Sequence, residues 1–94
     1  MGPAATPALR IDVPVPHPIR TSATIGYQVD ENEPVTIRVY DVKGRRVATL
    51  VEQTARAAGS GMVEFNASAL ASGVYFVRLE TPTGTVARKI TVLK

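Results

Sequence analysis

The sequence predicts an all-β protein, an antiparallel sandwich of about seven short strands. Two observations predict this class. Apolar and polar residues alternate over most of the chain, with the period of two that a half-buried strand requires. The 7 glycines and 7 prolines lie between the alternating segments, where they mark turns. No spacing typical of strand–helix–strand units competes with this pattern.

Residues 9–15 predict the first strand, because apolar residues there alternate with other residue types: Leu9, Ile11, Val13 and Val15. The segment also contains Pro14 and is followed by Pro16 and Pro18. Proline has no backbone N–H to donate to a neighbouring strand. We therefore expect this strand to lie at a sheet edge or to leave the sheet early.

The next two strands show the clearest alternation. Between residues 22 and 29 every second residue is apolar, namely Ala23, Ile25, Tyr27 and Val29. After an acidic turn at residues 30–34, the same pattern returns in Val35, Ile37 and Val39. Alternation of this kind predicts strands with those residues facing the core.

The second half of the chain predicts four further strands, at residues 46–51, 62–65, 74–79 and 86–92. The strand at 74–79 is expected to be central, with Tyr75, Val77 and Leu79 on its inner face. Residues 52–61 lose the alternation, and we expect a flexible connection there. Leu70 is the large apolar residue of the turn before Gly73 and is expected to close one end of the core. Seven short strands with this turn spacing are typical of an immunoglobulin-like sandwich.

Size and composition indicate one small domain. The 94 residues are 45% apolar and 20% charged, which is typical of a globular fold. We expect residues 1–8 to be a linker or a cloning remnant and residues 9–94 to be the folded domain. No segment approaches the ~20 apolar residues of a membrane span, and no signal peptide is visible. Cysteine is absent, so disulfides and thiolate metal sites are excluded.

The charge pattern argues against a nucleic-acid surface. The net charge is +3, but the 11 basic residues are scattered along every segment. Aromatic residues make up only 5% of the chain, and tryptophan is absent. Nucleic-acid-binding proteins gather basic residues into a stripe, often with aromatic platforms. We therefore expect no nucleic-acid partner.

No group of residues predicts catalysis, a cofactor or a metal site. The single histidine, His17, lies between two prolines, where a role in a turn is favoured over one as a general base. The acidic turn at residues 30–33 lacks the spaced oxygen ligands of a dedicated calcium loop, and weak calcium binding stays an open alternative. Asn66-Ala67-Ser68 has the pattern of a glycosylation acceptor, but in a tight turn we expect side-chain to backbone hydrogen bonds.

Three motifs in a fixed order carry a resemblance to a known family: PHPIRTSATIGYQV, VTIRVYDVKGRRVATLV and ALASGVYFVRLETPTGTVARKITVLK. Over residues 14–94 the chain resembles the C-terminal sorting domain, type A, of proteins exported by the type IX secretion system. It is also similar in layout to the immunoglobulin-like domain of the flagellar hook-capping protein. One departure is His17, which stands between two prolines where the family usually has asparagine.

The motifs also contain three residues suited to turns. Asp41 precedes a turn in which its carboxylate is expected to accept hydrogen bonds from backbone amides. Gly44 supplies the positive φ that such a turn needs. Gly73 is expected to let a tight turn lead into the central strand.

The resemblance implies a sorting function. It implies that the domain lies behind a fused N-terminal cargo domain in a secreted protein. It further implies that the outer-membrane secretion machinery recognises the domain once the protein has reached the periplasm. A sortase-like peptidase then commonly removes the domain, and the cargo reaches the cell surface or the medium.

The last strand is the expected recognition site. The chain stops inside this strand, its final run mixes apolar and basic residues, and the resemblance is strongest there. We expect the export machinery to contact the face and end formed by Arg88, Lys89, Val92 and Lys94. The alternative is a last core strand with solvated lysines, because edge strands often carry lysine.

The rival function is that of a non-catalytic carbohydrate-binding or structural immunoglobulin-like accessory module in a secreted multidomain enzyme. Carbohydrate-binding domains usually present exposed aromatic platforms. Here tryptophan is absent, and Tyr40 is the one aromatic residue expected to face outward. A single exposed tyrosine is a poor platform, so the sorting function is favoured.

Overall fold

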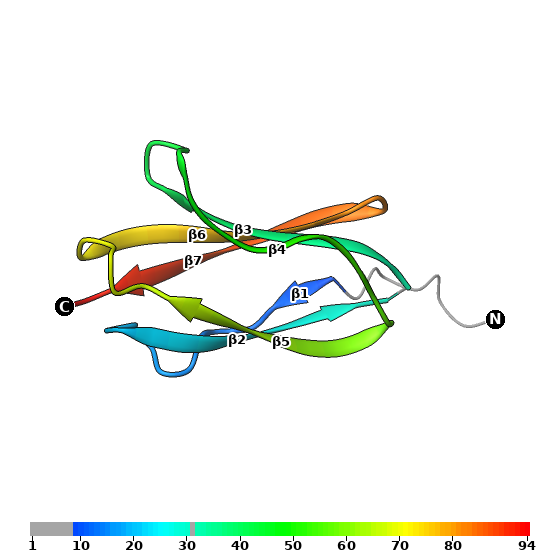
Figure 1. Ribbon diagram of the computed structural model, residues 1–94, viewed down its shortest axis with the longest axis horizontal. Coiled ribbons are helices and arrows are strands. Elements are labelled where there is room, and N and C mark those ends of the chain that lie inside the picture. Colours follow the sequence, from blue (N-terminus) through cyan, green and yellow to red (C-terminus); the bar gives the residue numbers. More distant parts are fainter. Residues whose placement is uncertain (1–8, 31) are drawn as a thin grey trace.

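The computed structural model describes residues 9–30 and 32–94, which form two antiparallel sheets packed face to face (Figure 1). The seven strands are β1 (Arg10–Ile11), β2 (Ser22–Val29), β3 (Glu33–Asp41), β4 (Arg46–Arg56), β5 (Gly59–Asn66), β6 (Gly73–Thr81) and β7 (Gly84–Val92). The described residues form no helix that could cross a membrane. The predicted all-β sandwich is therefore confirmed. The linker expected at residues 1–8 lies outside the described residues.

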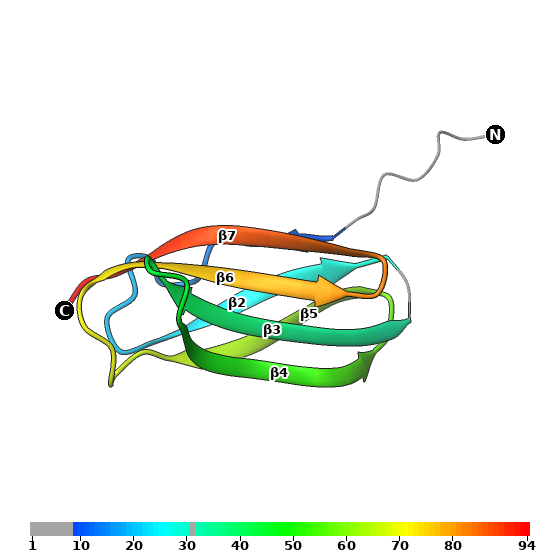
Figure 2. The same cartoon turned by 90° about the horizontal axis from the view of Figure 1, so that it is seen from above.

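The smaller sheet has the strand order β1-β2-β5 and the larger sheet the order β4-β3-β6-β7. Figure 2 shows the four strands of the larger sheet side by side, with β2 and β5 in the layer beneath. β4 and β5 follow one another in the chain but belong to different sheets, so the chain crosses between the layers there. Each sheet ends in two edge strands, and β7 is one edge of the larger sheet.

The core fills the space between the two sheets. β2, β3 and β6 each bury one apolar face, and Ile25, Ile37 and Val77 are at most 1% exposed. Phe65 of β5 is fully buried among them. Leu70 packs against this core from the turn between β5 and β6. The inner faces predicted for β2, β3 and β6 are therefore confirmed.

Tyr27 of β2 lies across Gly61, its partner in the β2–β5 register. A Cβ atom at Gly61 would overlap the Tyr27 ring, which is 3% exposed and fixed by its packing. The Tyr27 ring thus packs over the backbone of Gly61, which has no side chain of its own to cover it. On the outer face of the same sheet, a Cβ atom at Gly26 would lie 2.7 Å from Oδ2 of Asp12. That atom is the free end of a half-exposed side chain, so this second contact can relax.

β1 leaves the sheet early, as expected. The residues after it, however, do not face the sides that their alternation in the sequence predicts. Asp12 N–H donates to Gly26 O at 2.9 Å, whereas Val15 N–H donates to Thr24 O at 3.0 Å. Three steps along this segment therefore oppose two steps along β2, which is a bulge, and a bulge moves the following residues to the other face. Val15 is consequently 71% exposed, Val13 is 49% exposed, and Pro14 is buried instead.

The flexible connection expected at residues 52–61 is wrong. β4 continues to Arg56, β5 begins at Gly59, and only residues 57 and 58 connect them. The pairing of β3 with β4 contains three register shifts, and Gln53 has a φ of 42°. Each irregularity shifts the inward position along the strand. The alternation is lost in the sequence for that reason, although the strand persists.

Candidate recognition surface

β7 carries three of the four residues predicted for recognition, and their side chains have different surroundings. Arg88 pairs with the core residue Val77 and donates from Nε to the carbonyl of Ile11 at 2.6 Å. Val92 is fully buried. Lys89 is exposed, and its side chain has no hydrogen bond or ion pair within residues 9–30 and 32–94. Arg88 and Lys89 are both exposed, and of these two only Lys89 has a side chain without an internal hydrogen bond among the described residues.

Lys94 is tied to the turn between β5 and β6. Its backbone N–H donates to Ser72 Oγ at 2.9 Å, and its Nζ donates to the carbonyls of Ala67 at 2.7 Å and Ser68 at 3.2 Å. In Figure 1 this end of the chain lies at the same pole as that turn. The ammonium group satisfies carbonyls of the turn, so Lys94 has a structural role at this pole.

Part of the β7 edge is covered by residues 17–19, which we call the covering segment. Ile19 and Val92 form a parallel bridge. Ile19 N–H donates to Thr91 O at 2.9 Å, and Leu93 N–H donates to Ile19 O at 2.8 Å. Nε2 of His17 accepts from Thr91 N–H at 3.1 Å. His17 therefore bonds a distant strand, where the sequence suggested a role within its own turn.

The covering segment was missed because its prolines interrupt any period. The signal that could have revealed it is Ile19, the large apolar residue between the prolines and β2, which is fully buried. An irregular segment can pair with a strand edge when its backbone donors and acceptors are free. One apolar side chain beside them, here that of Ile19, holds the segment against the core. The covering segment connects the smaller sheet to the edge of the larger one.

Within residues 9–30 and 32–94, no segment pairs with the remaining part of the β7 edge. Thr91 directs both its N–H and its C=O to the covering segment. Alternate residues of a strand direct their backbone groups to the same side, so those of Thr85, Ala87 and Lys89 point to this edge as well. Among the described residues no strand pairs with them. This stretch offers a row of free backbone donors and acceptors beside the exposed Lys89.

The turn between β3 and β4 is organised by Asp41. Its Oδ1 accepts from the backbone N–H groups of Lys43 and Arg45, both at 2.9 Å, and its Oδ2 lies 2.9 Å from Arg45 Nε. Gly44 has a φ of 82°, which a side chain would disfavour. The hydrogen bond from the Arg45 amide is the main cause that holds the pKa of Asp41 below its ordinary value. Gly73 begins β6 opposite Val92.

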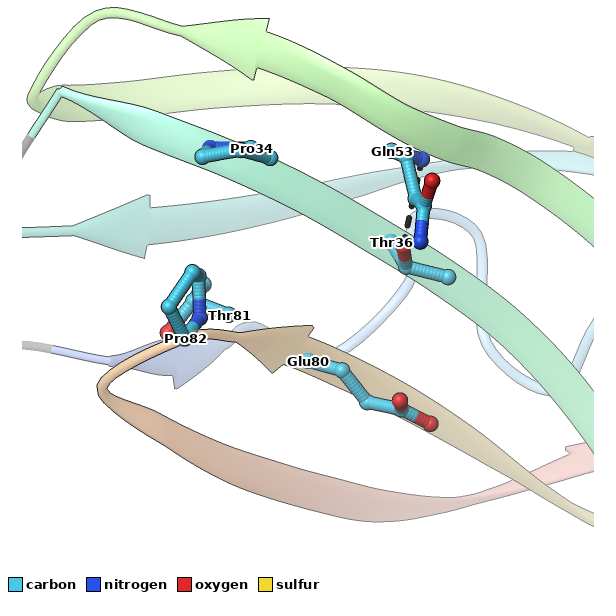
Figure 3. Close-up of a pocket in the computed structure, with 6 residues that line it drawn as sticks. All are labelled: Pro34, Thr36, Gln53, Glu80, Thr81 and Pro82. Atoms are coloured by element: carbon cyan, nitrogen blue, oxygen red, sulfur yellow. Dashed lines mark hydrogen bonds between the residues drawn. The ribbon is translucent and has the colours of Figure 1, made fainter.

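Among the hollows on the described part of the chain, two lie over the outer faces of the sheets. The first, of about 380 Å³, is lined by Pro34, Thr36, Gln53, Glu80, Thr81 and Pro82 (Figure 3). Gln53 N–H donates to Thr36 Oγ1 at 3.1 Å, and Figure 3 shows Glu80 pointing away from Pro82. Glu80 pairs with Arg78 at 3.1 Å. The carboxylate in this hollow is paired with Arg78, and the other polar groups are hydroxyls and an amide. These groups do not form a pair of nucleophile and base or of acid and base.

The second hollow, of about 570 Å³, lies over Gly26 on the smaller sheet and is walled by Val13, Val15 and Met62. These three side chains are 49%, 71% and 73% exposed. The hollow is mainly apolar and brings no titratable cluster together. Within the described residues no group of three or more metal-ligating side chains occurs.

The strand order defines the class of protein. β1, β2 and β5 form one sheet, while β3, β6 and β7 form the other with β4 beside β3, which is the arrangement of an immunoglobulin-like sandwich. Residues 15–93 match the family described as the secretion system C-terminal sorting domain, and the chain belongs to this family. The resemblance that its motifs indicated is confirmed.

Among solved structures, the chain is similar to the Ig1 domain of mouse SynCAM 2, with 15% sequence identity and a TM-score of 0.44. The match covers 85% of this chain and 92% of that domain. A comparison with curated proteins finds no match.

Membership of the family establishes what the domain does. It is a C-terminal sorting signal for type IX secretion, which directs export to the cell surface or the medium. The sorting function is thereby supported over that of a carbohydrate-binding or structural accessory module. As a sorting signal, the domain interacts with the secretion machinery.

Proposed function

We propose that the secretion machinery recognises this domain by adding a strand to the uncovered part of the β7 edge, with Lys89 contacting the partner. In this proposal Arg88, Val92 and Lys94 position the edge. The domain is non-catalytic, and a sortase-like peptidase separates it from a fused N-terminal cargo after export.

The free backbone groups of Thr85, Ala87 and Lys89 carry this proposal. Strand addition obtains its affinity from main-chain hydrogen bonds and its specificity from side chains on alternate positions. The exposed lysine protects the edge against self-association, and it attracts an acidic partner. Arg88 and Lys94 are bonded within the domain, so their contribution is to keep β7 straight and its end in place.

The test removes one edge donor without disturbing the sheet. Ala87→Pro deletes an N–H that points away from β6, and proline is tolerated on an edge strand in that orientation. Ala87→Ser keeps the N–H at the same position and is the matched control. In a host with type IX secretion, a reporter fused to the 94-residue chain should be exported with Ala87→Ser and fail with Ala87→Pro. Both purified proteins should melt at similar temperatures.

Normal export of a folded Ala87→Pro protein would exclude strand addition at this edge. If Ala87→Pro is unfolded, Lys89→Ala provides the second comparison, because its side chain has no internal partner in the described part of the chain. Lys94→Ala should instead lower thermal stability, since it removes two hydrogen bonds to the turn. Full export without the whole domain would contradict the sorting function itself.

Removal of the domain by a peptidase has a separate test. The intact mass of the exported reporter should lack residues 9–94. A reporter that arrives at the surface with these residues still attached would contradict the processing step and leave recognition unaffected.

A further inference from the structure

Four side chains form a row across the outer face of the larger sheet, which we call the aromatic–cation row: Arg46, Tyr40, Phe76 and Lys89. The register pairs each with the next, Tyr40 with Arg46, Tyr40 with Phe76, and Phe76 with Lys89. Residues paired in this way share a face and lie close enough for their side chains to interact. Phe76 is 37% exposed although it is a large apolar residue in the middle of a sheet. Figure 2 shows the four strands that contribute to the row lying side by side.

In the described part of the chain, the two cations at the ends of this row have no carboxylate partner, in contrast to the neighbouring cations. Arg38 and Arg78, which face one another on β3 and β6, are paired with Glu52 at 2.8 Å and Glu80 at 3.1 Å. Arg46 and Lys89 have no ion pair within residues 9–30 and 32–94. The sheet therefore neutralises one row of cations and leaves the adjacent row positively charged around two aromatic rings.

The spacing of the row specifies a ligand geometry. Strands lie about 4.8 Å apart, so the three steps from β4 to β7 span about 14 Å. An extended polypeptide rises about 3.4 Å per residue, so two of its residues 14 Å apart are about four positions apart. Positions i, i+2 and i+4 of an extended chain lie on the same face. A segment with acidic residues at i and i+4 and an apolar residue at i+2 would thus meet Arg46, the aromatic pair and Lys89.

We propose that the aromatic–cation row binds an extended acidic segment of the secretion machinery that runs across the strands of the larger sheet. The inference rests on the sorting function and on Lys89 as a contact residue, and it adds the chemistry of the partner. Carboxylates would pair with Arg46 and Lys89, and the central apolar side chain would cover Phe76. Arg46 lies beside Tyr40 and Lys89 beside Phe76, so each cation also has a cation–π attraction to a ring. This attraction persists when the cation binds a carboxylate.

The binding test uses the complete 94-residue chain and two synthetic peptides of equal composition. In one peptide two glutamates are four positions apart with a leucine midway, and in the other the glutamates are adjacent. Titration of isotope-labelled protein, followed by amide chemical shifts, should show saturable changes at Tyr40, Phe76 and Lys89 with the first peptide. Raising the ionic strength should weaken the binding, because both contacts are exposed charges.

Matched variants locate the site. Phe76→Ser, and Arg46→Glu combined with Lys89→Glu, should weaken the first peptide at least about tenfold, a loss of 1.4 kcal/mol. Arg10→Glu reverses a cation on the other sheet, where Arg10 pairs with Asp12 at 2.8 Å, and should leave the affinity unchanged. Equal binding of the two peptides, equal binding to vesicles of anionic lipid, or no saturable binding would each overturn the inference.

Export of the reporter separates this inference from strand addition at the edge. Arg46→Glu and Phe76→Ser lie on β4 and β6, so they leave the backbone groups of β7 intact. If these variants keep their thermal stability but are not exported, the result supports binding at the aromatic–cation row. This holds even if Ala87→Pro is exported normally and the proposal of strand addition at the β7 edge is thereby excluded. Normal export of both would exclude the row, whatever Ala87→Pro does.

Discussion

Ile19 and Val92 form a parallel bridge that connects the segment between β1 and β2 to the edge of the opposite sheet. Both side chains are fully buried. The same contact therefore packs the core and covers the end of the β7 edge. An uncovered strand edge is a site for pairing with other chains. The covering segment restricts such pairing to the part of β7 that precedes Thr91.

Loss of the covering segment should expose the end of β7. Ile19→Ala removes a fully buried side chain, and we expect it to lower the free energy of unfolding by about 2–5 kcal/mol. His17→Ala removes only the acceptor for Thr91 N–H and should cost about 0.5–1.5 kcal/mol. Hydrogen exchange checks both, because the Thr91 amide should exchange faster in each variant. An unchanged Thr91 exchange rate in His17→Ala would contradict the assigned hydrogen bond.

The inner faces of the two sheets should tolerate no truncation. Ile25→Ala or Ile37→Ala should lower the free energy of unfolding by about 2–5 kcal/mol, and Val77→Ala by about 1–4 kcal/mol, through lost burial and the cavity that remains. Urea denaturation measures these changes. Val42→Ala is the control, since Val42 is 68% exposed and should change stability by less than about 0.5 kcal/mol. Small effects at the three core positions would mean that the faces are assigned wrongly.

Two glycines of the smaller sheet should differ in their tolerance of alanine. Gly61→Ala places a Cβ atom against the buried ring of Tyr27, so that the ring or the strand must move, at a cost of about 1–3 kcal/mol. Gly26→Ala meets only the end of the Asp12 side chain, which can turn away and give up an exposed ion pair with Arg10. Thermal melting of the two variants should show a clear loss for the first and little for the second. The reverse order would contradict the packing of Tyr27.

Stability should depend on pH through Asp41. The folded-state pKa of Asp41 is lowered relative to the unfolded chain, so its contribution is complete above the unfolded pKa and is lost as the pH falls through the folded pKa. Asp41→Asn should therefore melt below the parent protein at neutral pH, and the difference should shrink on acidification. Asp30→Asn, at an exposed position, is the control. A difference that stays constant down to strongly acidic pH would contradict the role of the carboxylate.

Alternation in the sequence predicted the strands that have a neighbour on both sides. β2, β3 and β6 each bury one face along most of their length, so Ile25, Ile37 and Val77 could be assigned correctly. It failed for the residues that follow β1 and for the second half of β4, where the pairing of an edge strand is irregular. Each extra residue in a bulge exchanges the inner and outer positions, and residues 12–15 and 46–56 contain no glycine that could mark where this occurs.

The residues predicted for recognition are neighbours in the sequence, whereas the structure separates them by face. Arg88 and Lys89 are adjacent in the chain, yet one points inward to Ile11 and the other outward beside Phe76. The aromatic–cation row joins residues from four strands, with Tyr40 and Lys89 far apart in sequence. Only the pairing of the strands brings them together, so pattern analysis within single segments could not find it.

The contact between His17 and Thr91 joins residues 74 positions apart, which sets an order on folding. The β6–β7 hairpin needs only a two-residue connection, so it can form locally and fast, whereas closing so long a loop costs more entropy and comes later. A chain that emerges gradually from a ribosome releases residues 17–19 first. Their docking partner at residues 91–93 follows only after every strand before it has emerged. Until that moment the hydrophobic interior is open along one side, so the domain reaches its protected state only when the whole of β7 is free to pack.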